Sequence, residues 1–159
     1  MPQALALPDF RTSALEILRE TFEKVDGNYL DGGTSLFETL DGVTAETASR
    51  SASDRVATLA AQVDHPGYYI QVLLAHLRAG GQDTSFTSDW DVAWNRTTAT
   101  ADEWTGLIAT LRDEYEQFQE FVTANENWNV DVIGGVLAVL SHCAYHLGEI
   151  RQALGVIPE

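Results

Sequence analysis

The sequence predicts an all-α protein, a bundle of four main antiparallel helices. Apolar residues recur at helical spacing in four segments, and no segment alternates apolar and polar residues as a half-buried strand would. Three S/T-x-x-E patterns have the form of the capping box that begins many helices: Ser13–Glu16, Ser35–Glu38 and Thr100–Glu103. With 159 residues, 45% of them apolar, the chain is expected to fold as one domain over residues 1–159.

The N-terminal part is expected to hold one longer helix and two short ones. The first follows Ser13 and stops at the turn D-G-N, residues 26–28. The second follows Ser35 and ends near Gly42, and Thr44 begins one or two further helical turns in the sequence AETAS.

A long helical pattern then runs from near Ser53 to the glycine pair 80–81, with Pro66 inside it. Proline removes one helical hydrogen bond and clashes with the preceding turn. We therefore expect either a kink near His65 or two abutting helices.

Two more helices are expected in the C-terminal half. One opens at the capping box of Thr100. The last covers about residues 130–154, capped by Asn129 or Asp131, with Gly155 as the C′ residue just beyond its end.

The chain is strongly acidic, with 24 Asp and Glu residues against 9 Lys and Arg and a net charge of −15. Such a surface repels phosphate backbones and anionic membranes, so nucleic-acid and membrane partners are not expected. The N-terminus lacks the basic region and apolar core of a signal peptide, and no run approaches the roughly 20 apolar residues that span a bilayer. A soluble, cytoplasmic protein is expected.

Histidine spacing suggests a metal site. His142 and His146 lie four residues apart, so they project from one helix face, and imidazoles at this spacing can bind one ion. The alternative is ordinary packing, with one histidine hydrogen-bonded in the core and the other at the surface. A third ligand must come from another helix, which leaves His65 and His76. His65 is favoured because it adjoins the distortion expected at Pro66, whereas His76 is expected near a helix end.

Two neighbours of this pair carry reactive groups. Glu149 follows His142 by seven residues, close to the same face, and is a candidate further ligand, hydrogen-bond acceptor for an imidazole, or general base. Cys143 points toward the packed side, where a small buried hydrophobe is favoured over a nucleophile.

The irregular stretch 80–99 is long enough to suggest a functional loop. It contains two tryptophans. Together with three tyrosines near the candidate ligands, they are candidates for the walls of a pocket, although each aromatic residue is also a plausible core residue: Trp90, Trp94, Tyr68, Tyr69 and Tyr145.

Three segments resemble the DinB/YfiT-like superfamily of bacterial metal-binding four-helix bundles: HCAYHLGEIRQALG, TLAAQVDHPGYYIQVLL and SLFETLDGVTAETASRS. The resemblance extends over roughly residues 10–155. It implies an up-down-down-up bundle and an open divalent-metal site made by His65, His142 and His146. Two positions depart from the family pattern, because Glu149 stands where glutamine is common and Pro66 directly follows the first ligand.

The resemblance also implies a function. Characterised relatives include metal-dependent thiol S-transferases that use mycothiol, bacillithiol or glutathione, and mycothiol-dependent maleylpyruvate isomerases. We therefore expect a zinc or nickel enzyme of the thiol S-transferase or hydrolase type. It would act on a small molecule such as a low-molecular-weight thiol, with Glu149 moving a proton, and homodimers are common among such proteins. The alternatives are a stress-response binding module with a structural or vestigial metal site, and a bundle that binds no metal.

Overall fold

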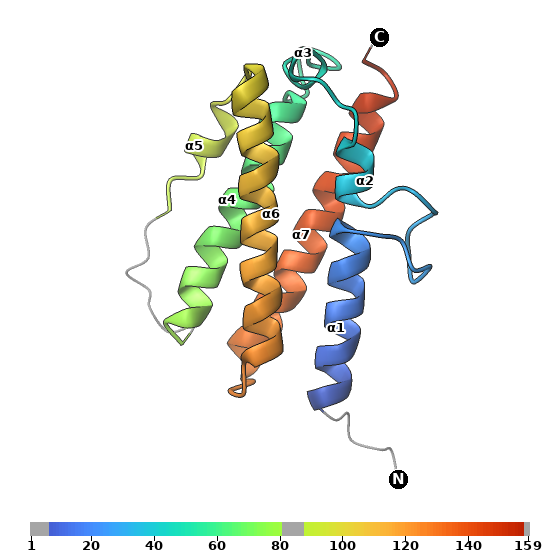
Figure 1. Cartoon of the computed structure of the whole chain (residues 1–159). Helices are drawn as coiled ribbons and strands as arrows, with labels where there is room; N and C mark the ends of the chain where they lie inside the picture. The colour runs from blue at the N-terminus through green and yellow to red at the C-terminus, as the bar shows by residue number, and fades with distance from the viewer. Residues whose placement is uncertain (1–6, 81–87, 158–159) are drawn as a thin grey trace.

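The computed structural model describes residues 7–80 and 88–157. Within these two ranges, all regular secondary structure is helical, which confirms the all-α prediction (Figure 1). The helices are α1 (Leu7–Phe22), α2 (Leu36–Leu40), α3 (Ala45–Ala48), α4 (Leu59–Arg78), α5 (Asp91–Trp94), α6 (Ala101–Ala124) and α7 (Val130–Leu154).

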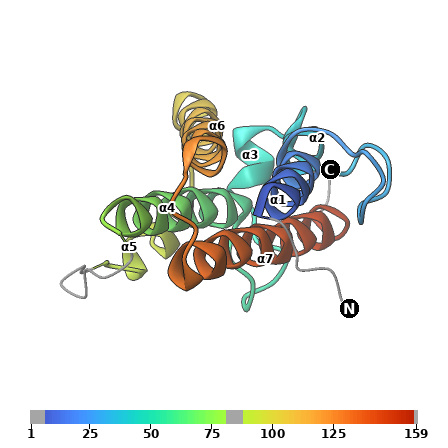
Figure 2. The same ribbon diagram turned by 90° about the horizontal axis from the view of Figure 1, so that it is seen from below.

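The four long helices, α1, α4, α6 and α7, enclose the core. Seen along the bundle, α1 and α4 occupy opposite corners, and each packs against both α6 and α7 (Figure 2). Burying one large apolar side chain contributes roughly 1.5–3 kcal/mol, so these contacts dominate the stability of the bundle. The largest fully buried apolar side chains come from all four long helices and from α2: Leu18, Phe22, Leu36, Leu59, Ile70, Leu74, Leu111, Tyr115, Phe118, Leu147 and Ile150.

Side-chain caps set the starts of five helices. Ser35 and Thr100 form complete capping boxes with Glu38 and Glu103, as the sequence predicts. Thr44, Thr58 and Asn129 cap α3, α4 and α7 through their side-chain oxygens. Each cap satisfies a backbone N–H that the helix leaves without a partner.

The first predicted capping box is wrong. α1 already includes Leu7, so Ser13 and Glu16 lie within the helix, where both side chains are exposed. The earlier start is compatible with Pro8, because the first turn of a helix does not use the N–H that proline lacks. The pattern S-x-x-E occurs here on a solvent-facing helix surface rather than at a helix end.

α4 begins later than predicted and is not divided. Thr58 caps it, and residues 53–58 form a bend and turn followed by irregular backbone instead of helix. The helix continues through Pro66, so the expectation of two abutting helices is wrong. Pro66 and Gly67 are both buried, and a Cβ added at Gly67 would lie 3.7 Å from the backbone of Leu111 on α6. Close packing of α4 along α6 and α7 offsets the hydrogen bond that proline removes.

The ends of α7 correct two further expectations. Asn129, rather than Asp131, is the N-cap, since its side chain accepts the N–H of Val132 at 2.9 Å. Gly155 is the C-cap with a φ of −69°, in the right-handed region, so it does not supply the left-handed C′ conformation that favours glycine.

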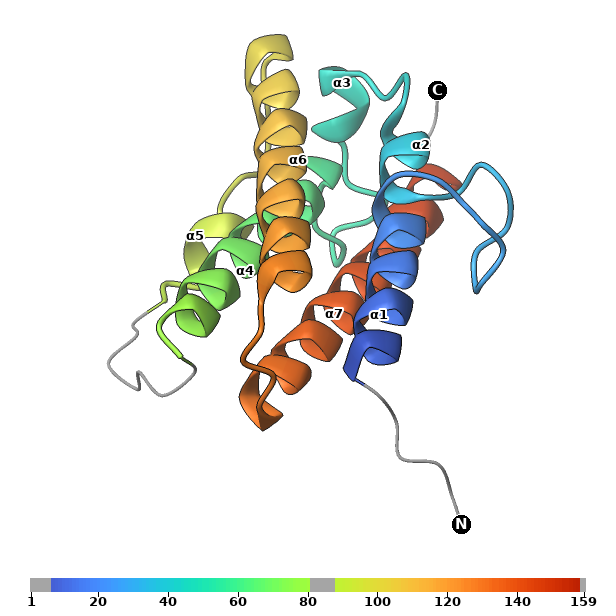
Figure 3. The ribbon, with the colours of Figure 1, turned by 60° about the horizontal axis from the view of Figure 1, so that its bottom comes forward.

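The stretch 80–99 contains α5, which packs against α4 on the side away from α1 (Figure 3). Residues 81–87 lie outside the described part of the chain. This short helix brings Trp90 and Trp94 to the surface of α4 that carries His65.

The expectation that no segment has the length and apolar composition of a membrane-spanning helix does not hold for α7. By length and composition it could cross a bilayer, with a mean hydropathy of 1.4 in its most apolar window. In this fold, 39% of that window is buried, where α7 packs against α1 and α4. Its buried apolar residues include Val132, Val136, Val139, Leu147 and Ile150.

Candidate metal centre

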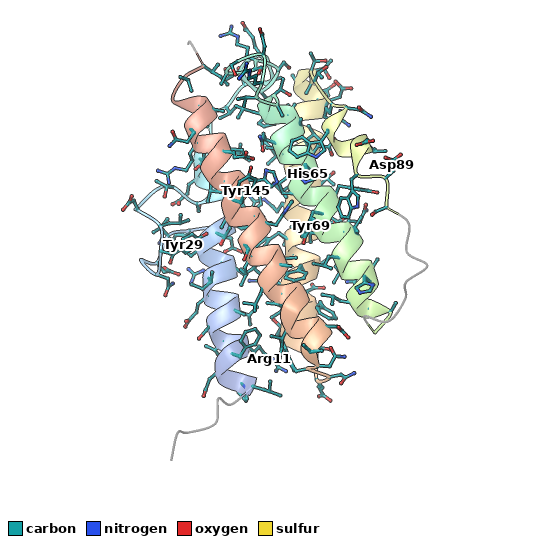
Figure 4. All side chains as sticks on the ribbon, turned by 180° about the vertical axis from the view of Figure 1, so that it is seen from behind. Arg11, Tyr29, His65, Tyr69, Asp89 and Tyr145 are labelled. Carbon is teal, nitrogen blue, oxygen red and sulfur yellow. The ribbon has the colours of Figure 1, made fainter. Side chains whose placement is uncertain are left out.

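Three of the four histidines meet where α4 packs against α7. One ring nitrogen from each of His65, His142 and His146 lies within 4.8 Å of the others. Nitrogens bound to one tetrahedral zinc ion lie about 3.4 Å apart, so the ligand set needs only a small contraction. His65 lies on α4, in the region facing α7 (Figure 4). His76, about three turns further along α4, is not part of the cluster.

The nitrogen atoms of these histidines fit a metal. His65 Nδ1 and His142 Nε2 are buried and have no hydrogen-bond partner within the part of the chain that the structure describes. A buried polar atom without a partner is costly, and a bound cation would satisfy both nitrogens. His146 Nδ1 lies 2.8 Å from Gln62 Oε1 and 3.0 Å from Glu149 Oε2. Since a carboxylate can only accept, Nδ1 carries the proton, which leaves the Nε2 lone pair free.

All three imidazoles are held neutral. Burial, with a smaller contribution from His146, lowers the pKa of His65 to about 4 despite the carboxylates of Asp64 and Glu149. Burial, with His146 and His65, lowers the pKa of His142 to about 4. Burial also lowers the pKa of His146, although Glu149 acts in the opposite direction. Near neutral pH these rings therefore offer lone pairs instead of positive charges.

Aromatic rings fix the orientation of two histidines. Trp94 from α5 stacks on His65 with a centroid separation of 4.2 Å and an interplanar angle of 27°. Tyr69, one helical turn after His65 on α4, stacks on His142 at 3.8 Å and 16°. Stacking leaves the ring-edge nitrogens free while restricting rotation of each imidazole.

The remaining candidate aromatics are more peripheral. Trp90 lies 6.4 Å from His65 and 5.8 Å from both Tyr68 and Tyr69, measured between ring centroids. The Tyr68 hydroxyl accepts the backbone N–H of Asp89 at 3.2 Å, so it holds the segment that leads into α5.

Glu149 bridges two residues of α7. One carboxylate oxygen accepts from His146 Nδ1, and the other accepts the Tyr145 hydroxyl at 2.6 Å. The Glu149 side chain is 34% exposed, so it reaches solvent from the edge of the site. The sequence leaves three roles open for Glu149. In the structure its carboxylate is a hydrogen-bond acceptor for an imidazole, which is one of these roles.

A pocket of about 470 Å³ opens beside the cluster. All three histidines and Glu149 line it, and its outer wall combines apolar and charged residues: Arg55, Val56, Ala57, Trp94 and Tyr145. A small molecule in this pocket would therefore reach the ring nitrogens directly.

A comparison with protein-family models matches residues 31–150 to the DinB superfamily. The protein belongs to the DinB superfamily. No curated protein and no solved structure matches the chain.

The range matched to the DinB superfamily contains all three clustered histidines, so the candidate metal centre lies within the part of the chain that shows the family. Gln62 is a residue of this DinB site that the sequence does not predict. Gln62 is buried at 4% exposure and contacts His146 from the facing helix. Its position three residues before His65 is the only sequence signal for it, because i and i+3 residues share a helix face.

Cys143 is fully buried, as predicted, and burial raises the pKa of its thiol.

Proposed function

We propose that this DinB protein is a metal-dependent enzyme in which His65, His142 and His146 hold one divalent ion, zinc or nickel, in an open site. The observation that supports the proposal most directly is the convergence of three neutral imidazoles, two of which have buried nitrogens without partners in the described structure. The proposal includes the up-down-down-up bundle topology. It is supported by the helix directions in Figure 1, where α1 and α7 run one way and α4 and α6 run the opposite way.

The proposed reaction is thiol S-transfer or hydrolysis on a small molecule. When bound, a zinc or nickel ion would supply Lewis acidity that lowers the pKa of a water or thiol. The protein residues contribute orientation and proton handling. Gln62 and Glu149 fix the tautomer of His146, Trp94 and Tyr69 hold the other two rings, and Glu149 is close enough to the pocket to accept a proton from the substrate.

The pocket supports an open site over a closed structural one. Structural zinc sites use four protein ligands, whereas catalytic sites keep a position for substrate. Among the described residues, the metal-ligating cluster has three members, and a pocket of about 470 Å³ adjoins it.

Metal analysis of protein purified without an affinity tag tests the ligand set. We expect one ion per chain in the wild type and in His76→Ala, a matched control outside the cluster. We expect loss of the ion in His65→Ala and in His142→Ala. Stoichiometric metal in both of these variants would exclude the three-histidine site.

Turnover tests the catalytic part of the proposal. The metal-loaded protein is assayed for S-transfer with mycothiol, bacillithiol and glutathione, and for hydrolysis of ester and amide substrates. We expect activity that disappears on chelation and returns with zinc or nickel. A protein that retains its ion but turns over none of these substrates would instead support the stress-response binding module.

A further inference from the structure

Arg55 lines the pocket next to the three histidines, and we propose that its guanidinium binds a carboxylate of the substrate. This inference rests on the proposed function, which it deepens by naming a substrate class, a small organic carboxylate with an apolar body. Among the described residues that line the pocket, Arg55 is the only one with a permanent positive charge.

The backbone around Arg55 is held in place. The Ser51 hydroxyl donates to the carbonyl oxygens of Ser53 and Val56, and the Val56 N–H donates to the Ser53 carbonyl at 3.0 Å. The Arg55 N–H donates to Ser53 Oγ at 3.4 Å. This turn is followed directly by Thr58, the N-cap of α4. A hydrogen-bonded loop therefore holds Arg55 on the pocket lining.

The Arg55 guanidinium is available to a ligand. Within the described ranges, no carboxylate or carbonyl pairs with this side chain, and the residue is exposed. The neighbouring Arg96, by contrast, donates to Asp64 at 2.7 Å. A free guanidinium forms two parallel hydrogen bonds with a carboxylate, which lysine cannot reproduce.

Charge and shape in the pocket favour the same ligand class. The protein has a net charge of −15, but among the described residues that line the pocket the only acid is Glu149. Imidazole ligands contribute no negative charge to a bound cation, and Glu149 offsets only part of the charge of a divalent ion, so the pocket would attract anions. Val56, Ala57 and Trp94 supply an apolar wall for the body of the ligand.

Calorimetric titration with two matched probes tests the inference. The probes are 3-phenylpropionate and its neutral amide, 3-phenylpropionamide, each titrated into zinc-loaded and metal-free protein. We expect the wild type to prefer the carboxylate by about tenfold, the value of one charge-assisted bidentate contact. In metal-free Arg55→Gln, where no cation attracts the carboxylate, this preference should fall below about twofold, and metal-free Arg55→Lys should retain part of it.

Arg112→Gln is the control, because it removes an equal charge from an exposed arginine on α6 that lies outside this pocket. We expect it to keep the wild-type preference. A carboxylate preference that survives in metal-free Arg55→Gln, or that is absent in the metal-free wild type, overturns the inference. Zinc content is measured in the same samples. Wild-type protein that binds no zinc contradicts the proposed metal site, and the metal-free titrations then still decide the role of Arg55.

Discussion

Gln62 Oε1 lies 2.8 Å from His146 Nδ1, and this buried hydrogen bond joins α4 to α7 at one of the candidate metal ligands. Both side chains are nearly inaccessible, at 4% and 3% exposure. The contact ties the orientation of one ligand to the helix that carries another, His65. The geometry of the site therefore depends on the packing of the two helices.

Replacing Gln62 by leucine should weaken metal binding by about tenfold or more, because a hydrogen-bonded acceptor sets the tautomer and basicity of a ligating histidine. Glu149 also accepts from Nδ1, so binding should persist. Competition with a zinc chelator measures the affinity. Gln71→Leu is the control on the same helix, where the side chain is exposed and bonds to Glu114. Equal affinities in the two variants would show that Gln62 does not position His146.

Trp94 should report metal binding through its fluorescence. Its ring stacks on His65 at 4.2 Å, so nickel or copper bound at the site should quench it strongly. We expect a large part of the metal-induced quenching to disappear in Trp94→Phe, which retains an aromatic ring against the imidazole. The remainder should come from Trp90, whose ring centroid lies 6.4 Å from that of His65. Trp128→Phe, which removes a tryptophan that packs against Phe10, should leave the quenching intact. The reverse pattern would place the ion away from α5.

The metal-free protein should lose stability as the pH falls from about 6.5 toward 4. The pKa values of His65 and His142 are about 4 in the folded state, below the ordinary value of 6.5. In this window the unfolded chain binds more protons than the folded chain, so lowering the pH favours unfolding. Each histidine contributes on the order of 1–2 kcal/mol between pH 7 and pH 5.

Urea unfolding at several pH values, with chelator present, measures this dependence. His65→Phe removes one of the titrating groups and should flatten the profile between pH 7 and pH 5. His76→Phe changes a histidine outside the cluster and is the matched control. An unchanged slope in His65→Phe would mean that His65 is not held neutral by burial.

Glu20 should be essential for the connection after α1. The residue is fully buried, and its carboxylate accepts the N–H groups of Asn28, Tyr29 and Leu30 at 2.7–2.8 Å. Glu20→Gln turns an amide NH₂ toward these donors, so the melting temperature should fall by about 5 °C or more. Glu16→Gln, an exposed change on the same helix, should leave the melting temperature nearly unchanged.

The effect of Glu20→Gln should also depend on pH. Burial acts to raise the pKa of Glu20, but hydrogen bonds from Tyr29, Leu30 and Asn28 outweigh it and lower the pKa to about 2. A carboxylate with a depressed folded pKa stabilises the protein above its unfolded value of 4.5, and this contribution is lost as the pH falls toward 2. The difference in melting temperature between the wild type and Glu20→Gln should therefore disappear in acid. A difference that stays constant with pH would contradict the role assigned to the Glu20 carboxylate.

Local patterns in the sequence predict most of the helices. The caps at Ser35 and Thr100 lie where their capping boxes place them, because a cap involves only residues three apart. The same reasoning fails at Ser13, since an identical pattern on an exposed helix surface has no orphan N–H to satisfy. Pro66 misleads for a different reason, because packing against α6 and α7 stabilises a helix that local propensity would divide.

The pairing of His142 with His146 is a property of the chain alone, because helical geometry places residues four apart on one face. The distortion expected at Pro66 also favours His65 over His76, but the meeting of His65 with this pair depends on how α4 packs against α7. Gln62, Trp94 and Arg55 are brought to His142 and His146 only by tertiary packing, although the sequence makes Trp94 a candidate pocket wall. They are brought there by the burial of apolar surface between helices, which acts without regard to separation along the chain.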